Sequence, residues 1–226
     1  MEKTTLGQLK EKERTLRQNL IIEAARAVFG EKTYDKVSMA EIAQKAGISK
    51  SSIYTYFTNQ EELHVEITVR DTRNFINTLD HHINDRAQEE LTIRGVIDLF
   101  LGYYLVHEPQ WRMTTHFALH GNRETGSVEK LDMVAREVLD LLETLFKRLG
   151  FKADTRLLAH TLFSSLSGIL IAFRNYPGRS DRDRQHHMHR IGSMVEALFI
   201  AFAEKKNRED GSDLSSRLSG TNLPTS

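Results

Sequence analysis

The sequence predicts an all-α protein with a small N-terminal head and a larger helical body. Apolar residues recur at spacings of three and four along most of the chain, which is the period of an amphipathic helix. Only three of the 226 residues are proline, and no segment alternates apolar and polar residues as a half-buried strand does. The chain contains no cysteine, so disulfides and thiolate metal sites are excluded.

The first two predicted helices of the head are recognised by their ends. One runs from about Glu13 to Gly30, with its apolar residues on one face. The next begins at Ser38, which forms a capping box with Glu41 because each side chain can satisfy the other's backbone N–H. We expect this second helix to end at Gly47.

Two further helices follow in the head. Ser49 is expected to cap a helix that runs to about Phe57. Asn59, with Glu62 three residues later, begins a longer helix that continues to about His82 and links the head to the body. The first three helices therefore form a three-helix bundle.

The body is expected to contain five more helices, and the chain is expected to end in a tail. The periodicity places these helices over residues 90–107, 109–120, 127–149, 154–176 and 182–206. From residue 207 onward small polar residues dominate, which predicts a disordered tail over 207–226. The predicted domains are thus 1–65 for the head and 66–206 for the body.

Charge and apolar length limit the partners. The chain has 31 basic and 31 acidic residues, so any affinity for nucleic acid depends on local placement rather than on net charge. The longest apolar stretch, Val96 to Val106, is too short to span a bilayer, and no signal peptide is seen. We therefore expect a cytoplasmic protein with no membrane partner.

Residues 37–63, VSMAEIAQKAGISKSSIYTYFTNQEEL, contain two short helices joined by a tight turn. Gly47 can adopt the left-handed conformation that such a turn needs. Ile42 and Ile53 pack between the helices, as in a helix-turn-helix. This packing leaves polar groups on the outer face of the second helix, where they can enter a major groove: Lys50, Ser51, Ser52, Tyr54 and Thr55.

Residues 13–65 resemble the DNA-binding domain of the TetR family of transcriptional regulators. The positions that match in register are Ser38, Ile42, Ala43, Ala46, Gly47, Ile48, Ser49, Ile53, Tyr54, Tyr56, Phe57 and Leu63. The resemblance implies a homodimer bound to a palindromic double-stranded DNA operator. It also implies repression that ends when a small-molecule effector enters a C-terminal ligand-binding and dimerisation domain.

The resemblance also implies the DNA contacts. Ser38 and Met39 would place a helix N-terminus at a phosphate, and Tyr54 and Tyr56 would hydrogen-bond the DNA backbone. Tyr56 could instead pack the head. The remaining candidates are Lys50, Ser51, Ser52 and Thr55 for base edges and Gln60, which replaces the family's usual phosphate-binding lysine.

A basic cluster precedes this domain. Its members are Lys3, Lys10, Lys12, Arg14 and Arg17. Two interpretations stay open: a solvated helix start, or a DNA-contacting arm over residues 1–12.

The body supplies candidates for dimerisation and for an apolar or amphipathic effector. Residues on two helical stripes are expected to pair with a second copy: Leu162, Ser165, Leu166, Ile169, Phe173, Ile191, Met194, Val195, Leu198 and Phe202. Aromatic and polar side chains are expected to line a ligand cavity: Phe100, Tyr103, Tyr104, His107, Trp111, His116, Phe117, His120 and Phe163. Both sets could instead be ordinary core.

Other functions are weighed against this one. An architectural DNA-binding protein without a small-molecule response remains the alternative. No nucleophile elbow, phosphate loop or HExxH motif is present, so we expect no enzyme activity and no cofactor. Histidines cluster at His186, His187 and His189, and at His116 and His120, but without a clear third ligand we expect no metal.

Overall fold

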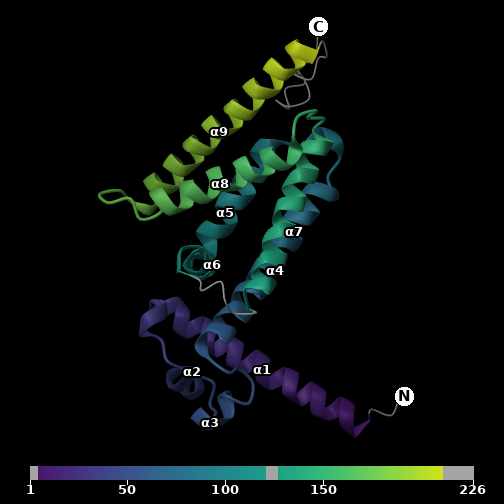
Figure 1. Ribbon diagram of the computed structural model, residues 1–226. Coiled ribbons are helices and arrows are strands. Elements are labelled where there is room, and N and C mark those ends of the chain that lie inside the picture. The colour runs from purple at the N-terminus through teal and green to yellow at the C-terminus, as the bar shows by residue number, and fades with distance from the viewer. Residues whose placement is uncertain (1–4, 121–126, 211–226) are drawn as a thin grey trace. The chain divides into compact units, whose positions relative to one another are not determined.

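The computed structural model describes residues 5–120 and 127–210, and their side chains over 5–116 and 129–206 (Figure 1). Within these ranges every regular element is a helix, which confirms the predicted fold class. The elements are α1 (Leu6–Glu31), η1 (Tyr34–Lys36), α2 (Met39–Lys45), α3 (Lys50–Ile53), α4 (Gln60–Asn84), η2 (Gln88–Glu90), α5 (Ile93–Val106), α6 (Glu108–His120), α7 (Ser127–Arg148), α8 (Thr155–Phe173) and α9 (Asp181–Asp210).

The chain divides into two compact units. The head unit comprises Met1–Thr72 and His107–Asp132, and the body unit comprises Arg73–Val106 and Met133–Ser226. This division differs from the predicted boundary after residue 65, because α6 packs against α1 and places Met113 in the core of the head. Helix α4 begins in the head unit and ends in the body unit.

Helix α1 is longer than predicted and only its second half is buried. Thr5 and Gln8 form a reciprocal capping box, so the helix begins at Leu6 rather than near residue 13. Its buried residues start at Ile21 and end at Phe29, where the helix packs on α2, α4 and α6. In Figure 1 the N-terminal half extends beyond α2 and α3. The apolar pattern could not reveal this half because it has no buried face.

The turn between α2 and α3 has the predicted conformation, but α3 is shorter than predicted. Gly47 has a φ of 70°, the left-handed region that glycine adopts without a steric penalty. Helix α3 ends at Ile53 instead of near residue 57, since the N–H groups of Thr55 and Tyr56 bond three residues back rather than four. The capping box of α2 is half formed: Ser38 accepts from the N–H of Glu41, whose carboxylate pairs with Lys32.

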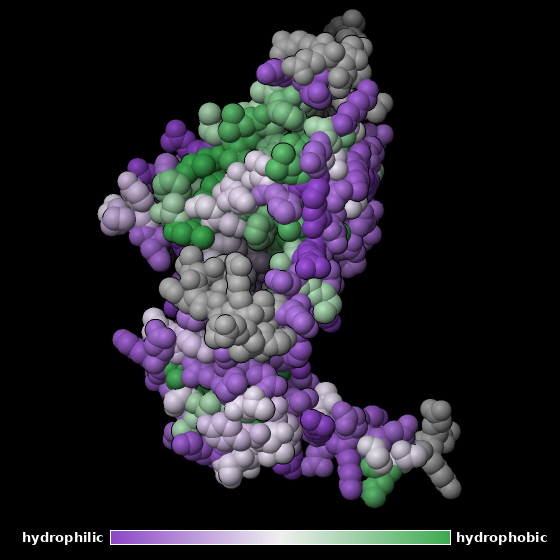
Figure 2. Space-filling model, viewed as in Figure 1, coloured by the Kyte–Doolittle hydropathy of each residue, from purple (hydrophilic) through white to green (hydrophobic). Residues whose placement is uncertain are grey.

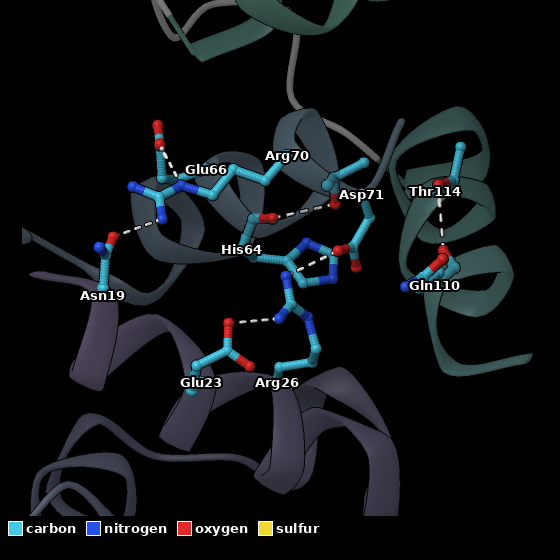
Figure 3. Close-up of polar contacts among 10 residues, drawn as sticks. Asn19, Glu23, Arg26, His64, Glu66, Arg70, Asp71, Gln110 and Thr114 are labelled. Atoms are coloured by element: carbon cyan, nitrogen blue, oxygen red, sulfur yellow. Dashed lines mark hydrogen bonds and ion pairs between the residues drawn. The ribbon is translucent and has the colours of Figure 1, made fainter. Parts of the chain in front are cut away.

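A buried ion pair joins α1 to α4 within the head unit. Arg26 Nη2 lies 2.7 Å from Asp71 Oδ1, and the Asp71 side chain is only 2% exposed (Figure 3). Burial raises the pKa of Asp71 more than Arg26 lowers it. A buried carboxylate is destabilising when its cation is absent, so the charged form of Asp71 depends on Arg26.

The body unit is built from packed helices around α5. Helices α8 and α9 pack on each other, and both contact α5. Asp98 links α5 to α9 by accepting from Arg94 Nε at 2.6 Å and by bonding His189 Nδ1 at 2.8 Å. Helix α9 continues to Asp210, so residues 207–210 of the predicted tail are helical, and the rest of the tail lies outside the described residues.

Helix α8 (Thr155–Phe173) is a longer apolar segment than the one predicted to be the longest. It is longer than the Val96–Val106 stretch, and it alone among the described helices is long and apolar enough to cross a membrane. The core helix of a water-soluble protein passes the same test, and α8 packs on α5 and α9.

Candidate functional site

Helix α3 presents a polar surface on a fixed apolar base. Ile53 is fully buried in the head core, whereas Lys50, Ser51 and Thr55 are exposed. Tyr54, a large and partly apolar side chain, is 46% exposed. The buried Ile53 therefore fixes the backbone of this segment, while its exposed polar side chains can contact a ligand in the solvent.

A hydroxyl cluster closes the N-terminal end of α3. Ser49 Oγ accepts from the N–H of Ser52 at 3.0 Å and caps the helix. It also lies 2.9 Å from Ser51 Oγ and 2.7 Å from Ser52 Oγ. The hydroxyls of Ser51 and Ser52 would thus exchange these bonds on contact with a base, while Lys50 lies outside the cluster.

Two of the predicted DNA contacts are placed elsewhere. The side chain of Met39 is 7% exposed and lies in the head core, so only its backbone N–H can face a phosphate. Gln60 Nε2 donates to the carbonyl of Tyr34 at 2.8 Å. Its amide therefore holds η1 to α4 instead of extending to the surface as the usual lysine would. Ser38 is exposed at the N-terminus of α2, as predicted.

A basic groove lies between the first half of α1 and the end of α3, with a volume of about 510 Å³. Its lining residues are Lys10, Glu13, Arg14, Arg17, Thr55 and Tyr56. Glu13 accepts from Arg17 at 2.7 Å, and Glu13 and then Tyr56 raise the pKa of Arg17. Tyr56, half-buried, contributes to both the core and this groove.

The groove bears on the two interpretations of the basic cluster. Residues 6–12 are helical, so they are not an extended arm, and Lys3 lies outside the described residues. Sequence reasoning identified these cations but not their position beside α3, since no apolar pattern marks this part of α1.

The predicted ligand-lining residues divide between the two units. In the body unit an aromatic cluster forms around Phe75, whose ring centre lies 5.4 Å from that of Phe100, 5.0 Å from Tyr103 and 4.9 Å from Tyr104. Phe163 joins it at 6.2 Å from Phe100. Phe75 was not predicted, although it lies on the apolar face of α4.

The other members belong to the head unit. His107 is half-buried, Trp111 is 5% exposed, and His116 stacks on Tyr34. The side chains of Phe117 and His120 lie outside the described residues.

The exposed face of α8 and α9 differs from the predicted dimer stripe. Leu162, Leu166 and Ile169 are buried within their own chain, so they offer no surface to a partner. The large apolar residues that are exposed on these two helices are Leu157, Ile171, Met194, Leu198 and Phe202. Figure 2 shows hydrophobic side chains gathered where α8 and α9 run in Figure 1. The half-buried members Ser165, Phe173, Ile191 and Val195 lie between the core and this face.

No group of three or more metal-ligating side chains occurs among the residues that the structure describes. His189 at the start of α9 bonds Asp98, and this contact connects α9 to α5.

The comparisons with known proteins agree with this geometry. The family model described as bacterial regulatory proteins, tetR family, matches residues 21–67. The chain is 26% identical over 94 residues to the HTH-type transcriptional activator FasR of Mycolicibacterium smegmatis, which is 42% of each chain. It is 30% identical over 77 residues to the fatty acid metabolism regulator protein of Bacillus subtilis, or 34% of this chain and 40% of that protein. The chain thus matches less than half the length of these relatives.

A solved structure extends the likeness in fold to most of the chain. The transcriptional regulator FadR of Bacillus subtilis, in complex with stearoyl-CoA, superposes with a TM-score of 0.59. The match covers 90% of this chain and 98% of that one, at 17% identity.

Proposed function

We propose that this chain, whose head matches the model of the tetR family of bacterial regulatory proteins over residues 21–67, is a cytoplasmic, homodimeric repressor of that family. It leaves a palindromic operator when a fatty acyl-CoA binds its body. The observation that carries the DNA-binding part is the surface of α3. Exposed Lys50 lies on α3, exposed Tyr54 and Thr55 lie in the turn that directly follows it, and buried Ile53 fixes the helix, as an element for the major groove requires.

The basic groove supports additional contacts with the DNA backbone. Lys10, Arg14 and Arg17 lie beside Thr55 and Tyr56, so they would follow the phosphates that flank the major groove entered by α3. Such local cations compensate for the zero net charge and for the absence of a lysine at position 60.

The effector class is supported by the relatives and by the body. The matched protein of Bacillus subtilis is named as a fatty acid metabolism regulator, and the FadR structure from the same organism holds stearoyl-CoA. The cluster around Phe75 gives the body unit an apolar, aromatic interior suited to an acyl chain. Release requires that the acyl-CoA bind the DNA-free conformation more tightly than the DNA-bound one.

Selection of bound duplexes from a random DNA pool tests the regulator. We expect an enriched inverted repeat, and its release when stearoyl-CoA is added. Enrichment without release by acyl-CoAs of any chain length would favour the architectural alternative, and a folded protein that enriches no sequence would overturn the proposal.

Replacing Tyr54 with Ala should weaken binding to that repeat by about tenfold to a hundredfold, since the change removes a group that touches DNA without disturbing the core. Fluorescence anisotropy with labelled operator measures the change. Tyr176→Ala is the matched control, because Tyr176 is 43% exposed but lies in the body unit. Equal affinities for the two variants would show that α3 is not the recognition helix.

Replacing Lys10, Arg14 and Arg17 together with Gln should lower the slope of log K against log salt concentration by about 0.9 for each phosphate that is no longer neutralised. The control changes Arg73, Arg182 and Lys205, three exposed cations of the body unit, to Gln. If both triple variants had the same slope, the groove would not be part of the DNA interface.

A further inference from the structure

A pocket of about 150 Å³ lies within the head unit, between the end of α1, η1, the start of α4 and α6. Its walls are formed by Phe29, Tyr34, His64, Met113 and His116. The volume is about that of an engineered protein cavity, roughly 150 Å³, that binds benzene. The pocket therefore has room for one aromatic ring, and it shares no residue with the aromatic cluster of the body unit.

Most of the wall residues are aromatic, and His64 is uncharged at neutral pH. The ring of His64 lies 5.0 Å from both Phe29 and Tyr34, and Tyr34 stacks on His116 at 4.4 Å. Burial, and to a lesser extent His116, lowers the pKa of His64 to about 3. Rings at these distances favour a further aromatic group over a flexible aliphatic one.

Two cations stand at the solvent side of the pocket, Lys32 and Arg112, both of them exposed. Lys32 pairs with Glu41. Arg112 Nη2 donates to the carbonyls of Gly30 at 2.6 Å and Phe29 at 3.4 Å, which fixes the guanidinium and leaves Nε and Nη1 for another acceptor. Within the described part of the chain no acidic side chain pairs with Arg112.

We propose that the head unit contains a second small-molecule site, which binds a planar aromatic carboxylate with a single ring. The ring lies against Tyr34, Met113 and His116, and the carboxylate accepts from Arg112. This site goes beyond the acyl-CoA proposed for the body. Its occupant would also stabilise η1, which is followed by Ser38 at the start of α2 and is held to α4 by Gln60.

Sodium benzoate is the probe, and the full-length protein labelled with ¹³C at its methionine methyl groups is the reporter. Met113 lines the pocket, while Met188 and Met194 in the body unit serve as internal references. We expect benzoate, with about nine non-hydrogen atoms, to shift the Met113 resonance with a Kd of about 0.1 to 1 mM. Met113→Leu assigns the signal.

The charge requirement is tested in two independent ways. Benzamide, which has the same ring without the charge, should bind the unmodified protein about tenfold more weakly. Arg112→Gln should weaken benzoate to a similar degree, and Arg73→Gln should not change it.

Three outcomes would overturn the proposal: an unshifted Met113 at about 10 mM benzoate, equal shifts with benzamide, or a shift confined to Met194. The benzamide comparison decides the matter even if Arg112→Gln fails to fold, because it uses the unmodified chain. None of these outcomes depends on operator binding or on acyl-CoA.

Discussion

At the scale of single residues, the head keeps a histidine where water cannot reach it. His64 is 1% exposed and is surrounded by the rings of Phe29, Tyr34 and His116; Figure 3 shows its ring between α1 and α6. Burial lowers its pKa from 6.5 to about 3, so the folded head holds it neutral. The unfolded chain, in contrast, takes up a proton near the usual pKa.

This difference makes the stability of the head depend on pH. Between pH 6.5 and about 3 the unfolded chain binds a proton at His64 that the folded chain does not, so the free energy of unfolding falls as the pH falls. Above pH 6.5 the folded and the unfolded chain both hold His64 neutral, so this loss of stability is absent there. From pH 7 to pH 5 we expect a loss of about 2 kcal/mol from this residue.

Urea denaturation at pH 7 and pH 5 measures the loss, and His64→Phe supplies the control because its ring cannot be protonated. Burial also lowers the pKa of His82, which titrates in both proteins. The effect of His64 is therefore the difference between the two proteins in how much unfolding free energy they lose from pH 7 to pH 5. Identical pH dependence in both would mean that His64 is protonated in the folded head.

At the scale of elements, one ion pair fixes α4 to α1. Arg26 and Asp71 meet at 2.7 Å, and Arg26 is itself only 26% exposed. Burial alone would lower the pKa of Arg26, but Asp71 and Glu23 outweigh it and raise the pKa. Each of the two charged side chains therefore stabilises the charged form of the other.

Arg26→Met should lower the free energy of unfolding by about 3 kcal/mol, since it leaves the Asp71 carboxylate buried without its cation. The double variant with Asp71→Leu should recover most of this loss. Arg17→Met is the control, because its partner Glu13 is 61% exposed and such pairs contribute about 0.5 kcal/mol or less. Chemical denaturation measures the free energy of unfolding of the three variants. If Arg26→Met lost no more than Arg17→Met, Asp71 would not depend on Arg26 for its burial.

The elements also show what the sequence could predict. Ser38, Gly47, Ser49 and the buried isoleucines marked the helix-turn-helix correctly, because caps, turns and apolar faces are local signals. The first half of α1 was missed since it has no buried face. The partner of Gln60 could not be predicted either, since contact with the carbonyl of Tyr34 arises only when η1 meets α4.

At the scale of the whole molecule, α8 and α9 present an exposed apolar face, to which we assign the proposed dimer interface. Met194 is 64% exposed, Leu198 68% and Phe202 43%, and a contiguous apolar patch on a protein surface often marks an interaction site. A second copy of the chain would cover this face and would supply the second head that a palindromic operator needs.

Replacing Leu198 and Phe202 with Glu should raise the dissociation constant of the dimer by about a hundredfold or more, because four carboxylates would be buried in each interface. Sedimentation velocity measures it. Leu16→Glu with Leu20→Glu is the matched control, since these leucines are 60% and 55% exposed on α1. A dimer that survives the first pair of changes and not the second would place the interface on α1.

The same uncovered face has a consequence for the life of the protein in the cell. If the chain forms the proposed dimer, a newly made protomer that has not met a partner presents Leu198 and Phe202 to chaperones and proteases, which act on exposed apolar surface. Pairing and degradation then compete for each new chain. Because pairing depends on the square of the protomer concentration, the steady-state amount of regulator falls more steeply than its rate of synthesis when expression is low.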